Sequence, residues 1–528
     1  MKYLSRWFLV SCVGLALLSL FNSAFAAERN IIFIITDDES PTLGCYGDKV
    51  ARTPSIDAIA ADGVLFRNAF ATTASCSASR SVVLSGLHNH RNGQFGHEHH
   101  YHKFTTYKDV ARLSMPNVLR EAGYRTGHIG KYHVGPESVY HFDTYMKGNQ
   151  RNPVDMAKNC QEFITADDPR PFLLYFATAD PHRGGGEDQT SKLELKPDLF
   201  GNKPKQASFP GINEQFFKPS EVAVPAFLPD SPETREELAQ YYQSCSRVDA
   251  GVAKLVEILK KANLYDKTLI VFTSDHGMAF SGGKTTVYEP GLRVPMVVRD
   301  PYQSKRGVEC TSLVSHIDIT PTLLDYARGL DASGNKPKKY GQQEVKVAPV
   351  SNGIFGVDSE TVPPREATPN APQENVNGGK SFDAYHGRSW LSLLAQPDKP
   401  HWETIFASHT FHEIQMYYPM RVVRDAKYKL IWNIAHPLPY PFASDLWTAS
   451  SWQAQFKQGP EAKYGTKTVH EYIRRPEFEL FDIQNDPHES TNLASKPEFK
   501  SVLAEYQKKL KEFQRSMDDP WILKWDYE

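Results

Sequence analysis

The sequence has few cysteines, and none of them form a CxxC pair. Six of the 528 residues are cysteine, and five lie beyond the N-terminal leader described below: Cys45, Cys76, Cys160, Cys245 and Cys310. Their odd number and wide spacing match neither a disulfide framework nor a zinc-binding pattern. We therefore expect free thiols. Because five is an odd number, at least one cysteine needs an explanation other than a disulfide.

The chain also lacks an excess of charge of either sign. It has 60 lysine and arginine residues against 62 aspartate and glutamate residues, which gives a formal net charge of −2. A nucleic acid or another polyanion would have to be attracted by a local cluster of basic residues, because the overall charge does not favour it. We expect no nucleic-acid partner, and nothing in the sequence indicates an oligomeric state.

Long hydrophobic runs are absent as well. The apolar stretch Trp7–Leu20 is shorter than the roughly 20 residues that span a bilayer, so we expect no membrane span. It follows the basic residues Lys2 and Arg6 and precedes Ala24-Phe25-Ala26, which has the small residues of a cleavage site. Residues 1–26 are therefore predicted to be a signal peptide, and the mature protein to be exported to the periplasm, the medium or a lysosome-like lumen.

The rest of the chain has the composition of a large folded protein, with 40% hydrophobic residues. Apolar, β-branched runs alternate with amphipathic helical stretches from residue 30 to about 330, which predicts an α/β fold with a mainly parallel sheet covered by helices. We expect a catalytic domain over 27–385, an exposed insertion or linker over 335–380, where Pro, Gly, Asn and Gln are frequent, and a smaller α+β domain over 386–528.

Polar residues gather where three apolar runs end. Asp37-Asp38, Asp180-Pro181-His182 and Asp275-His276-Gly277 each follow a predicted strand. In open α/β sheets the ligand lies beyond the carboxyl ends of the strands, so these three ends can meet in one site. Neighbouring carboxylates repel one another unless a cation lies among them, and oxygen ligands favour Ca²⁺, with Mg²⁺ as the second choice. The alternative is that these residues only cap the helices that follow.

A loop of small residues leads into another predicted helix. Ala74–Gly86 places Cys76 at or near the helix N-terminus, with Arg80 one turn later. Exposed backbone N–H groups, the helix dipole and a guanidinium all favour a bound anion. A free cysteine in this position can also be simply buried, which is the usual state of unpaired cysteines.

These motifs together resemble the sulfatase family. Cys76–Arg80 is similar to the C-x-[P/A]-x-R sequon in which the family oxidises cysteine to formylglycine, with Ala78 in the place of the more common proline. Gly123–His133 resembles the second family signature, and Asp37-Asp38 and Asp275-His276 resemble the metal-binding motifs. The resemblance implies an alkaline-phosphatase-like fold, a formylglycine derived from Cys76, and a maturation enzyme that produces it.

Four further segments are similar to the heparan N-sulfatases of this family. They are His128–Glu137, Asp180–Arg183, His412–Arg421 and Asp486–Glu489. The likeness covers nearly the whole mature chain except the 335–380 insertion. One position departs from it: His276 stands where the heparan N-sulfatases have Asn, whereas other sulfatases have Asp-His there, so we keep His276 as a ligand.

The resemblance also implies roles for individual residues. The metal ligands would be Asp37, Asp38, Asp275, His276 and the modified Cys76. The hydrated formylglycine would attack sulfur, Arg80 and Lys131 would hold it and the sulfate oxygens, and His133 would assist deprotonation. His182 and Lys284 would face the leaving group, although Lys284 could also be an ordinary solvated loop lysine.

Histidines are dense just after the cysteine helix, at positions 88, 90, 97, 99, 100 and 102. Their spacing is not that of a zinc site, so we expect them to line the rim of a pocket, with one or two contacts to a sugar. His412 and Glu413 precede an aromatic stretch and are predicted to bind substrate hydroxyls or an amine. The alternative for these two is packing between the domains.

The predicted function is hydrolysis of sulfate from a sulfated glycan, with the N-sulfate of terminal N-sulfoglucosamine in heparan-type fragments as the expected substrate. An O-sulfatase acting on another glycosaminoglycan position is the first alternative, because the catalytic core recognises only the sulfate group. A phosphate or phosphonate monoester hydrolase of the same fold is the second. If Cys76 stays a thiol, a non-catalytic glycan-binding protein is the third.

Overall fold

The computed structural model describes residues 29–99, 102–204, 207–329 and 385–527. The predicted signal peptide (1–26) and the predicted insertion (335–380) lie outside these ranges. No helix within the described ranges is both long and apolar enough to cross a membrane.

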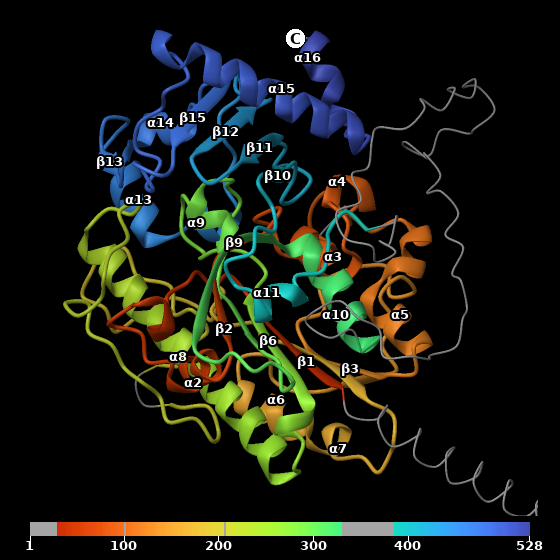
Figure 1. The fold of residues 1–528 in the computed structure, drawn as a ribbon. Coiled ribbons are helices and arrows are strands. Elements are labelled where there is room, and N and C mark those ends of the chain that lie inside the picture. The colour runs from red at the N-terminus through yellow and green to blue at the C-terminus, as the bar shows by residue number, and fades with distance from the viewer. Residues whose placement is uncertain (1–28, 100–101, 205–206, 330–384, 528) are drawn as a thin grey trace, which may run out of the picture.

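The core of the molecule is a nine-stranded, mainly parallel sheet (Figure 1). Its strand order is β4-β3-β5-β1-β6-β8-β2-β7, with β9 paired to β2. The strands are β1 (Asn30–Thr36), β2 (Val64–Phe70), β3 (Arg125–Gly130), β4 (Thr144–Met146), β5 (Phe172–Ala177), β6 (Thr268–Ser274), β7 (Arg293–Val294), β8 (Met296–Arg299) and β9 (Val308–Ser315). β1 pairs in parallel with both β5 and β6, so these three strands end at the same edge of the sheet.

Helices cover both faces of this sheet. Alternate residues of its central strand β1 point to opposite faces, and both sets of side chains are apolar and need to be buried. Ile32 and Ile34 of β1 pack with α2 (Pro54–Ala61), α6 (Pro153–Asn159) and α8 (Pro232–Lys261). Ile31, Phe33 and Ile35 pack with α3 (Cys76–Ser85), α5 (Met115–Glu121), α10 (Ile319–Ala327) and α11 (Leu391–Ala395). The near-continuous apolar sequence of β1 follows from burial on both faces.

Short helices complete the first part of the chain: α4 (Asn89–Asn92), α7 (Gln161–Ile164) and α9 (Glu289–Leu292). The long helix α8 begins where the side chain of Ser231 accepts a hydrogen bond from the backbone N–H of Thr234, and Pro232 occupies its first turn. Both residue types favour a helix start at these positions.

A second, antiparallel sheet of four strands lies in the C-terminal part of the chain, drawn in blue-green to blue in Figure 1. Its order is β10 (Ile405–His409), β11 (Met420–Arg424), β12 (Tyr428–Asn433) and β15 (Phe478–Asp482). The α-helices and remaining strands here are α12 (Ser444–Trp447), α13 (Ser450–Phe456), the pair β13 (Lys463–Tyr464) and β14 (Lys467–Thr468), α14 (Val469–Ile473), α15 (Lys500–Ser516) and α16 (Lys524–Tyr527). This α+β part follows the mixed sheet, as the sequence predicted.

A buried ion pair joins the two parts of the fold. The guanidinium of Arg183 donates to both carboxylate oxygens of Glu237 on α8, at 2.8 and 2.7 Å. The same carboxylate accepts hydrogen bonds from the backbone N–H of Ser450 (3.1 Å) and the hydroxyl of Ser451 (2.6 Å), which begin α13. Neither Arg183 nor Glu237 is exposed to solvent by more than 2%.

Replacing Glu237 with Ala should therefore destabilise the protein strongly, because it leaves the charge of Arg183 buried without its partner. The expected loss is about 3 to 5 kcal/mol in the free energy of unfolding, measured by urea denaturation. The neighbouring Glu236→Ala is the control, since Glu236 is not buried and its loss should change stability by no more than about 0.5 kcal/mol. Equal midpoints of urea denaturation for the two variants would contradict this role of Glu237.

Candidate active site

The carboxyl ends of β1 and β6 bring four predicted residues together. Asp37 and Asp38 follow β1 directly, and Asp275 and His276 follow β6, whose register pairs Thr36 with Ser274. The backbone N–H of Asp38 donates to Oδ1 of Asp275 at 3.0 Å. All four side chains are buried. The two strand ends thus form one polar site, as the sequence predicted.

Cys76 is the first residue of α3 and points into this site. Its Sγ lies 3.4 Å from Nε2 of His276 and 3.8 Å from Oδ1 of Asp38. Burial raises the pKa of the Cys76 thiol well above its ordinary value, so the unmodified side chain is a poor nucleophile here. The other four cysteines of the described chain are free thiols as well.

Each of the three carboxylates is paired with a basic side chain. The pairs are Asp37 Oδ2 with Lys131 Nζ (2.6 Å), Asp275 Oδ2 with Arg80 Nε (3.0 Å), and Asp38 Oδ2 with Lys284 Nζ (3.0 Å). Burial alone would raise the pKa of Asp37, but the positive charges of Lys131 and Arg80 hold it well below the usual value. Lys284 is only 1% exposed, so it is not the solvated loop lysine that the sequence left open.

The remaining atoms form a set of donors that suits a cation. Nδ1 of His276 lies 3.0 Å from the carbonyl oxygen of Gly277 and can donate to it. In the neutral ring this leaves the lone pair of Nε2 facing Oδ1 of Asp38 at 3.1 Å. A proton on Nε2 or a cation between the two atoms would satisfy this arrangement. Candidate ligand atoms of Asp38, Cys76 and His276 lie within 4.8 Å of one another, and so do those of Asp37, Cys76 and Asp275.

His182 follows β5 and borders the site on another side. Its Nδ1 lies 2.5 Å from the carbonyl oxygen of Arg183, and its Nε2 lies 2.8 Å from Nζ of Lys284. Burial lowers the pKa of His182, and the charge of Lys284 lowers it further. A neutral His182 that donates from Nδ1 presents Nε2 as an acceptor to the lysine ammonium.

Asp180 does not join the acidic group, although the sequence placed it at a converging strand end. Its carboxylate accepts hydrogen bonds from Arg151 (2.9 Å) and from Arg247 on α8 (2.7 Å). Only its backbone reaches the site, where the carbonyl oxygen accepts from the N–H of Asp37 at 3.1 Å. Asp180 therefore supports the β1 loop.

His133 lies among other histidines beside the acidic group. Its Nε2 is 2.6 Å from Nδ1 of His99, and the His99 ring in turn contacts His97. Burial lowers the pKa of His133 well below its ordinary value, with a further contribution from the charge of Lys131. The His97 ring packs on His412, with centroids 3.6 Å apart.

His412 and Glu413 differ in their surroundings. His412 is buried, and its Nδ1 lies 3.0 Å from the hydroxyl of Ser75, which precedes α3. Glu413 is half-buried, and one of its carboxylate oxygens lies within 4.8 Å of ring nitrogens of His97 and His412. His412 is therefore placed to support the start of α3, whereas Glu413 is the more accessible of the two.

The expectation that the dense histidines line a pocket rim is wrong for two of them. His88 and His90 are buried, and their rings pack against Phe513 of α15, so they belong to the contact between the two parts of the fold. His97 and His99 do lie beside the site, His102 is exposed, and His100 lies outside the described residues. The loop contains the helix α4, which turns the first two histidines toward the C-terminal part.

Asp445 on α12 also reaches this site, and the sequence analysis missed it. Its Oδ2 lies 2.8 Å from Nζ of Lys284 and 3.9 Å from Nε2 of His182. The surrounding sequence Ser444–Trp447 has no recognisable motif, and only the packing of α12 against the first part of the chain brings this carboxylate into place.

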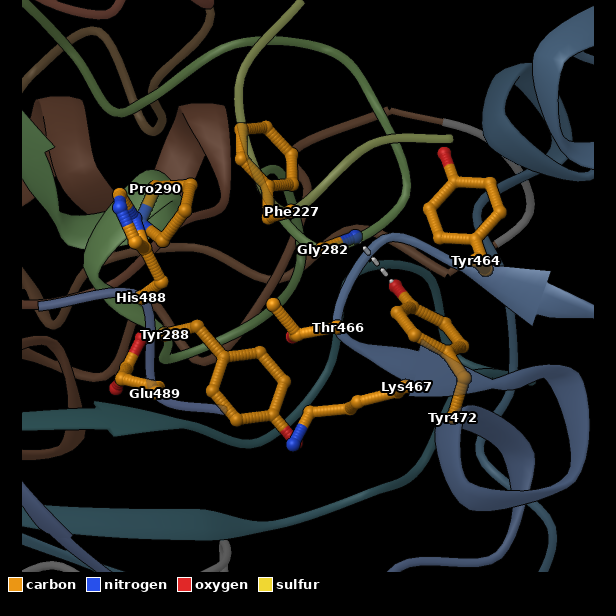
Figure 2. A pocket seen from close by; sticks show the side chains of 10 residues that line it. All are labelled: Phe227, Gly282, Tyr288, Pro290, Tyr464, Thr466, Lys467, Tyr472, His488 and Glu489. Carbon is orange, nitrogen blue, oxygen red and sulfur yellow. Dashed lines mark hydrogen bonds between the residues drawn. The ribbon is translucent and has the colours of Figure 1, made fainter. Parts of the chain in front are cut away.

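A separate small pocket lies behind the loop that carries Lys284 (Figure 2). Phe227, Gly282, Tyr288 and Pro290 line it from the first part of the chain, and Tyr464, Thr466, Lys467, Tyr472, His488 and Glu489 from the second. The backbone N–H of Gly282 donates to the hydroxyl of Tyr472 at 2.7 Å, as the dashed line shows. Because none of the predicted site residues lines this pocket, it does not compete with the site at the strand ends.

Sequence comparisons agree with these motifs. The family model described as Sulfatase matches residues 29–330. Human N-sulphoglucosamine sulphohydrolase is 33% identical over 521 residues, which cover 96% of this chain and 94% of that protein. An ulvan-active sulfatase of Formosa agariphila is 27% identical over 499 residues, covering 91% and 79% of the two chains.

Solved structures share the fold. A protein in complex with its substrate D-glucosamine-2-N,6-O-disulfate has a TM-score of 0.60 at 18% identity, covering 93% of this chain and 98% of that one. The phosphonate monoester hydrolase of Agrobacterium radiobacter has a TM-score of 0.56 at 17% identity, covering 92% and 96%. These similarities confirm the expected alkaline-phosphatase-like α/β fold.

The donor set predicts that the protein, once treated with a chelator, binds Ca²⁺. Asp38→Asn should weaken this binding at least about tenfold, because it removes a negative charge from the donor set. Asn is also tolerated at the positive φ of 67° that residue 38 adopts. Isothermal titration calorimetry measures the affinity, and the exposed Asp230→Asn is the matched control. If both variants bound Ca²⁺ as the unchanged protein does, the cation would lie elsewhere.

Proposed function

The chain belongs to the sulfatase family, and from this membership we propose that it removes the N-linked sulfate of terminal N-sulfoglucosamine in heparan-type fragments. The proposed nucleophile is a formylglycine produced from Cys76 by a maturation enzyme. The human relative, whose name states this activity, supports the substrate because the likeness extends over nearly the full length of both chains.

One observation supports the proposal most directly: Cys76 begins α3 in contact with Asp38 and His276 at the strand ends. A hydrated aldehyde at this position supplies a hydroxyl that can attack sulfur and a second hydroxyl through which sulfate can leave. A buried thiol with a raised pKa offers neither. The distances suit a side chain that works together with a cation.

Asp37, Asp38, Asp275 and His276 would hold that cation, together with the modified residue 76. Three carboxylates favour Ca²⁺, and Mg²⁺ remains the second choice. Bound there, the cation would lower the pKa of a hydroxyl at residue 76 and offset charge on the sulfate oxygens. The chain's own contribution is to fix the ligands. Arg80 pairs with both Asp275 and Asp37, and Lys131 also pairs with Asp37.

The sulfate itself would be held by basic groups around Cys76. Lys131 is 14% exposed and can turn toward an oxygen of the substrate while it remains near Asp37. The first N–H groups of α3 and the positive end of its dipole lie beside residue 76 and favour the same anion. Each preorganised donor typically contributes about 3 to 4 kcal/mol to transition-state stabilisation, so several must act together.

His182 and Lys284 would lie on the leaving-group side. The lysine ammonium donates toward Nε2 of His182 at 2.8 Å, which gives the pair a proton to pass to the departing atom. His133 is proposed to accept a proton from residue 76, and its lowered pKa keeps it in the neutral form before that transfer. Glu413 at the rim is proposed to contact the sugar, with His412 behind it.

Maturation is proposed to accompany export. The N-terminal leader would direct the chain to the periplasm, the medium or a lysosome-like lumen, and the maturation enzyme would act on Cys76–Arg80. Because Cys76 is fully buried in the folded chain, the oxidation would have to precede folding of this segment.

Mass spectrometry of the peptide that spans Cys76 should detect the aldehyde in active protein. Cys76→Ala should lower sulfate release at least about a thousandfold while the thermal midpoint stays close to that of the unchanged protein, because the nucleophile is lost and the fold is not. The buried Cys160→Ala is the matched control and should keep its activity. An active protein whose residue 76 is entirely thiol would refute the proposed chemistry.

The substrate assignment predicts a ranking. Release of sulfate from N-sulfoglucosamine should exceed release from 6-O-sulfated N-acetylglucosamine, as followed by ion chromatography of free sulfate under identical conditions. The reverse order would make the protein an O-sulfatase of the same family. Faster hydrolysis of a phosphate or phosphonate monoester would point to the phosphonate monoester hydrolases that share the fold.

A further inference from the structure

A fourth carboxylate stands at the edge of the proposed sulfate site, where it should repel the substrate. Asp445 reaches it from α12 in the C-terminal part, and 24% of its side chain is exposed. Burial acts to raise its pKa, but the positive charge of Lys284 holds it below the ordinary value. Asp445 is thus a negative charge in a pocket that must accept a sulfate, so its presence calls for an explanation.

Holding Lys284 in place does not require Asp445. The loop that carries this lysine is fixed by two tyrosines of the C-terminal part: Gly282 donates to Tyr472, and the hydroxyl of Tyr440 donates to the carbonyl oxygen of Thr285 at 2.8 Å. Nζ of Lys284 also keeps its ion pair with Asp38 at 3.0 Å. The lysine is therefore positioned from both sides without the carboxylate of residue 445.

Asp445 and His182 are the accessible groups next to Lys284. His182 is 25% exposed and Asp445 is 24% exposed, with 3.9 Å between Nε2 and Oδ2, whereas Lys284 is 1% exposed. A second metal ion at this point is disfavoured because Nζ of Lys284 already lies within 3.0 Å of Asp38, His182 and Asp445. The carboxylate thus faces the place where the leaving group would be released.

The two classes of substrate differ in the charge of that leaving group. Hydrolysis of a sulfamate converts R–NH–SO₃⁻ and water into R–NH₃⁺ and SO₄²⁻. The S–N bond breaks with its electron pair on nitrogen, nitrogen takes up both protons of the water, and the oxygen of the water ends in sulfate. An O-sulfate ester instead gives a neutral alcohol, a sulfate and a released proton. Only the sulfamate produces a cation where the bond breaks.

We propose that Asp445 is the specificity-determining residue that favours N-linked over O-linked sulfate, by accepting the N–H of the sulfamate and attracting the ammonium that forms from it. This inference rests on the proposed function and adds a residue to it. The carboxylate repels the sulfate of every substrate equally, but it attracts only a leaving nitrogen. The net effect is a preference for amine-linked sulfate.

Equilibrium binding of the product sugars tests this directly, without any turnover. Glucosamine, in its protonated form, should bind the full-length protein more tightly than N-acetylglucosamine does, as measured by NMR titration. Asp445→Asn should weaken glucosamine binding about tenfold or more, the effect of losing one close charge pair, and change N-acetylglucosamine binding less than about twofold. Asp445→Glu, which keeps the negative charge, should retain the preference for glucosamine. This variant shows that a substitution at position 445 does not by itself disrupt the site.

Binding of free sulfate separates this role from simple support of Lys284. If Asp445 acts on the leaving group, Asp445→Asn should bind sulfate as tightly as the unchanged protein or more tightly, because one repulsive charge is gone. If Asp445 only positioned Lys284, the Asp445→Asn variant would bind sulfate more weakly and would lose affinity for both sugars alike. Either result would overturn the inference. Asp518→Asn, an exposed aspartate paired with Arg91, is the matched control and should change none of these values.

Kinetics then connect the residue to the reaction. Asp445→Asn should lower kcat/KM for N-sulfoglucosamine about tenfold. The ratio of this kcat/KM to the kcat/KM for 6-O-sulfated N-acetylglucosamine should fall by the same factor. If the unchanged protein failed to hydrolyse N-sulfoglucosamine, the proposed function would fall, whereas the sugar-binding comparison would still decide whether Asp445 recognises an amine.

Discussion

The balance between buried carboxylates and buried cations at one edge of the sheet is the constraint on which the rest of this structure depends. Asp37, Asp38 and Asp275 lie together beyond two parallel strands, where desolvation and mutual repulsion oppose their ionised forms. Arg80 and Lys131 neutralise two of them from α3 and from the loop after β3. The site therefore combines carboxylate oxygens that suit a divalent ion with basic groups that suit an anion.

The C-terminal part of the chain completes this arrangement instead of merely covering it. Tyr440 and Tyr472 hold the loop of Lys284, and Asp445 faces the same lysine from α12. The buried pair of Arg183 and Glu237 fixes α13 against the long helix α8. Because these contacts surround the proposed leaving-group side, we propose that the second part selects the sulfated substrate, whereas the strand ends carry the proposed chemistry.

Much of the site follows from the sequence because it depends on local patterns. Asp37, Asp38, Asp275 and His276 could be placed from the rule that ligands gather beyond the ends of parallel strands, and Cys76 from its sequon. The errors concern tertiary contacts: Asp180 follows a strand like the others, but Arg247 on a distant helix binds its carboxylate. Asp445 and the burial of His88 against α15 likewise depend on how the two parts pack, which no short motif encodes.

The central claim is that residue 76 and a divalent cation share this cavity. A crystal structure of the matured protein grown with Ca²⁺ tests it most directly. It should contain one ion about 2.3 to 2.6 Å from oxygens of Asp37, Asp38 and Asp275 and from an oxygen of the modified residue 76, with His276 completing the ligands. An ion bound away from these carboxylates, or a side chain at position 76 turned out of the cavity, would contradict the account.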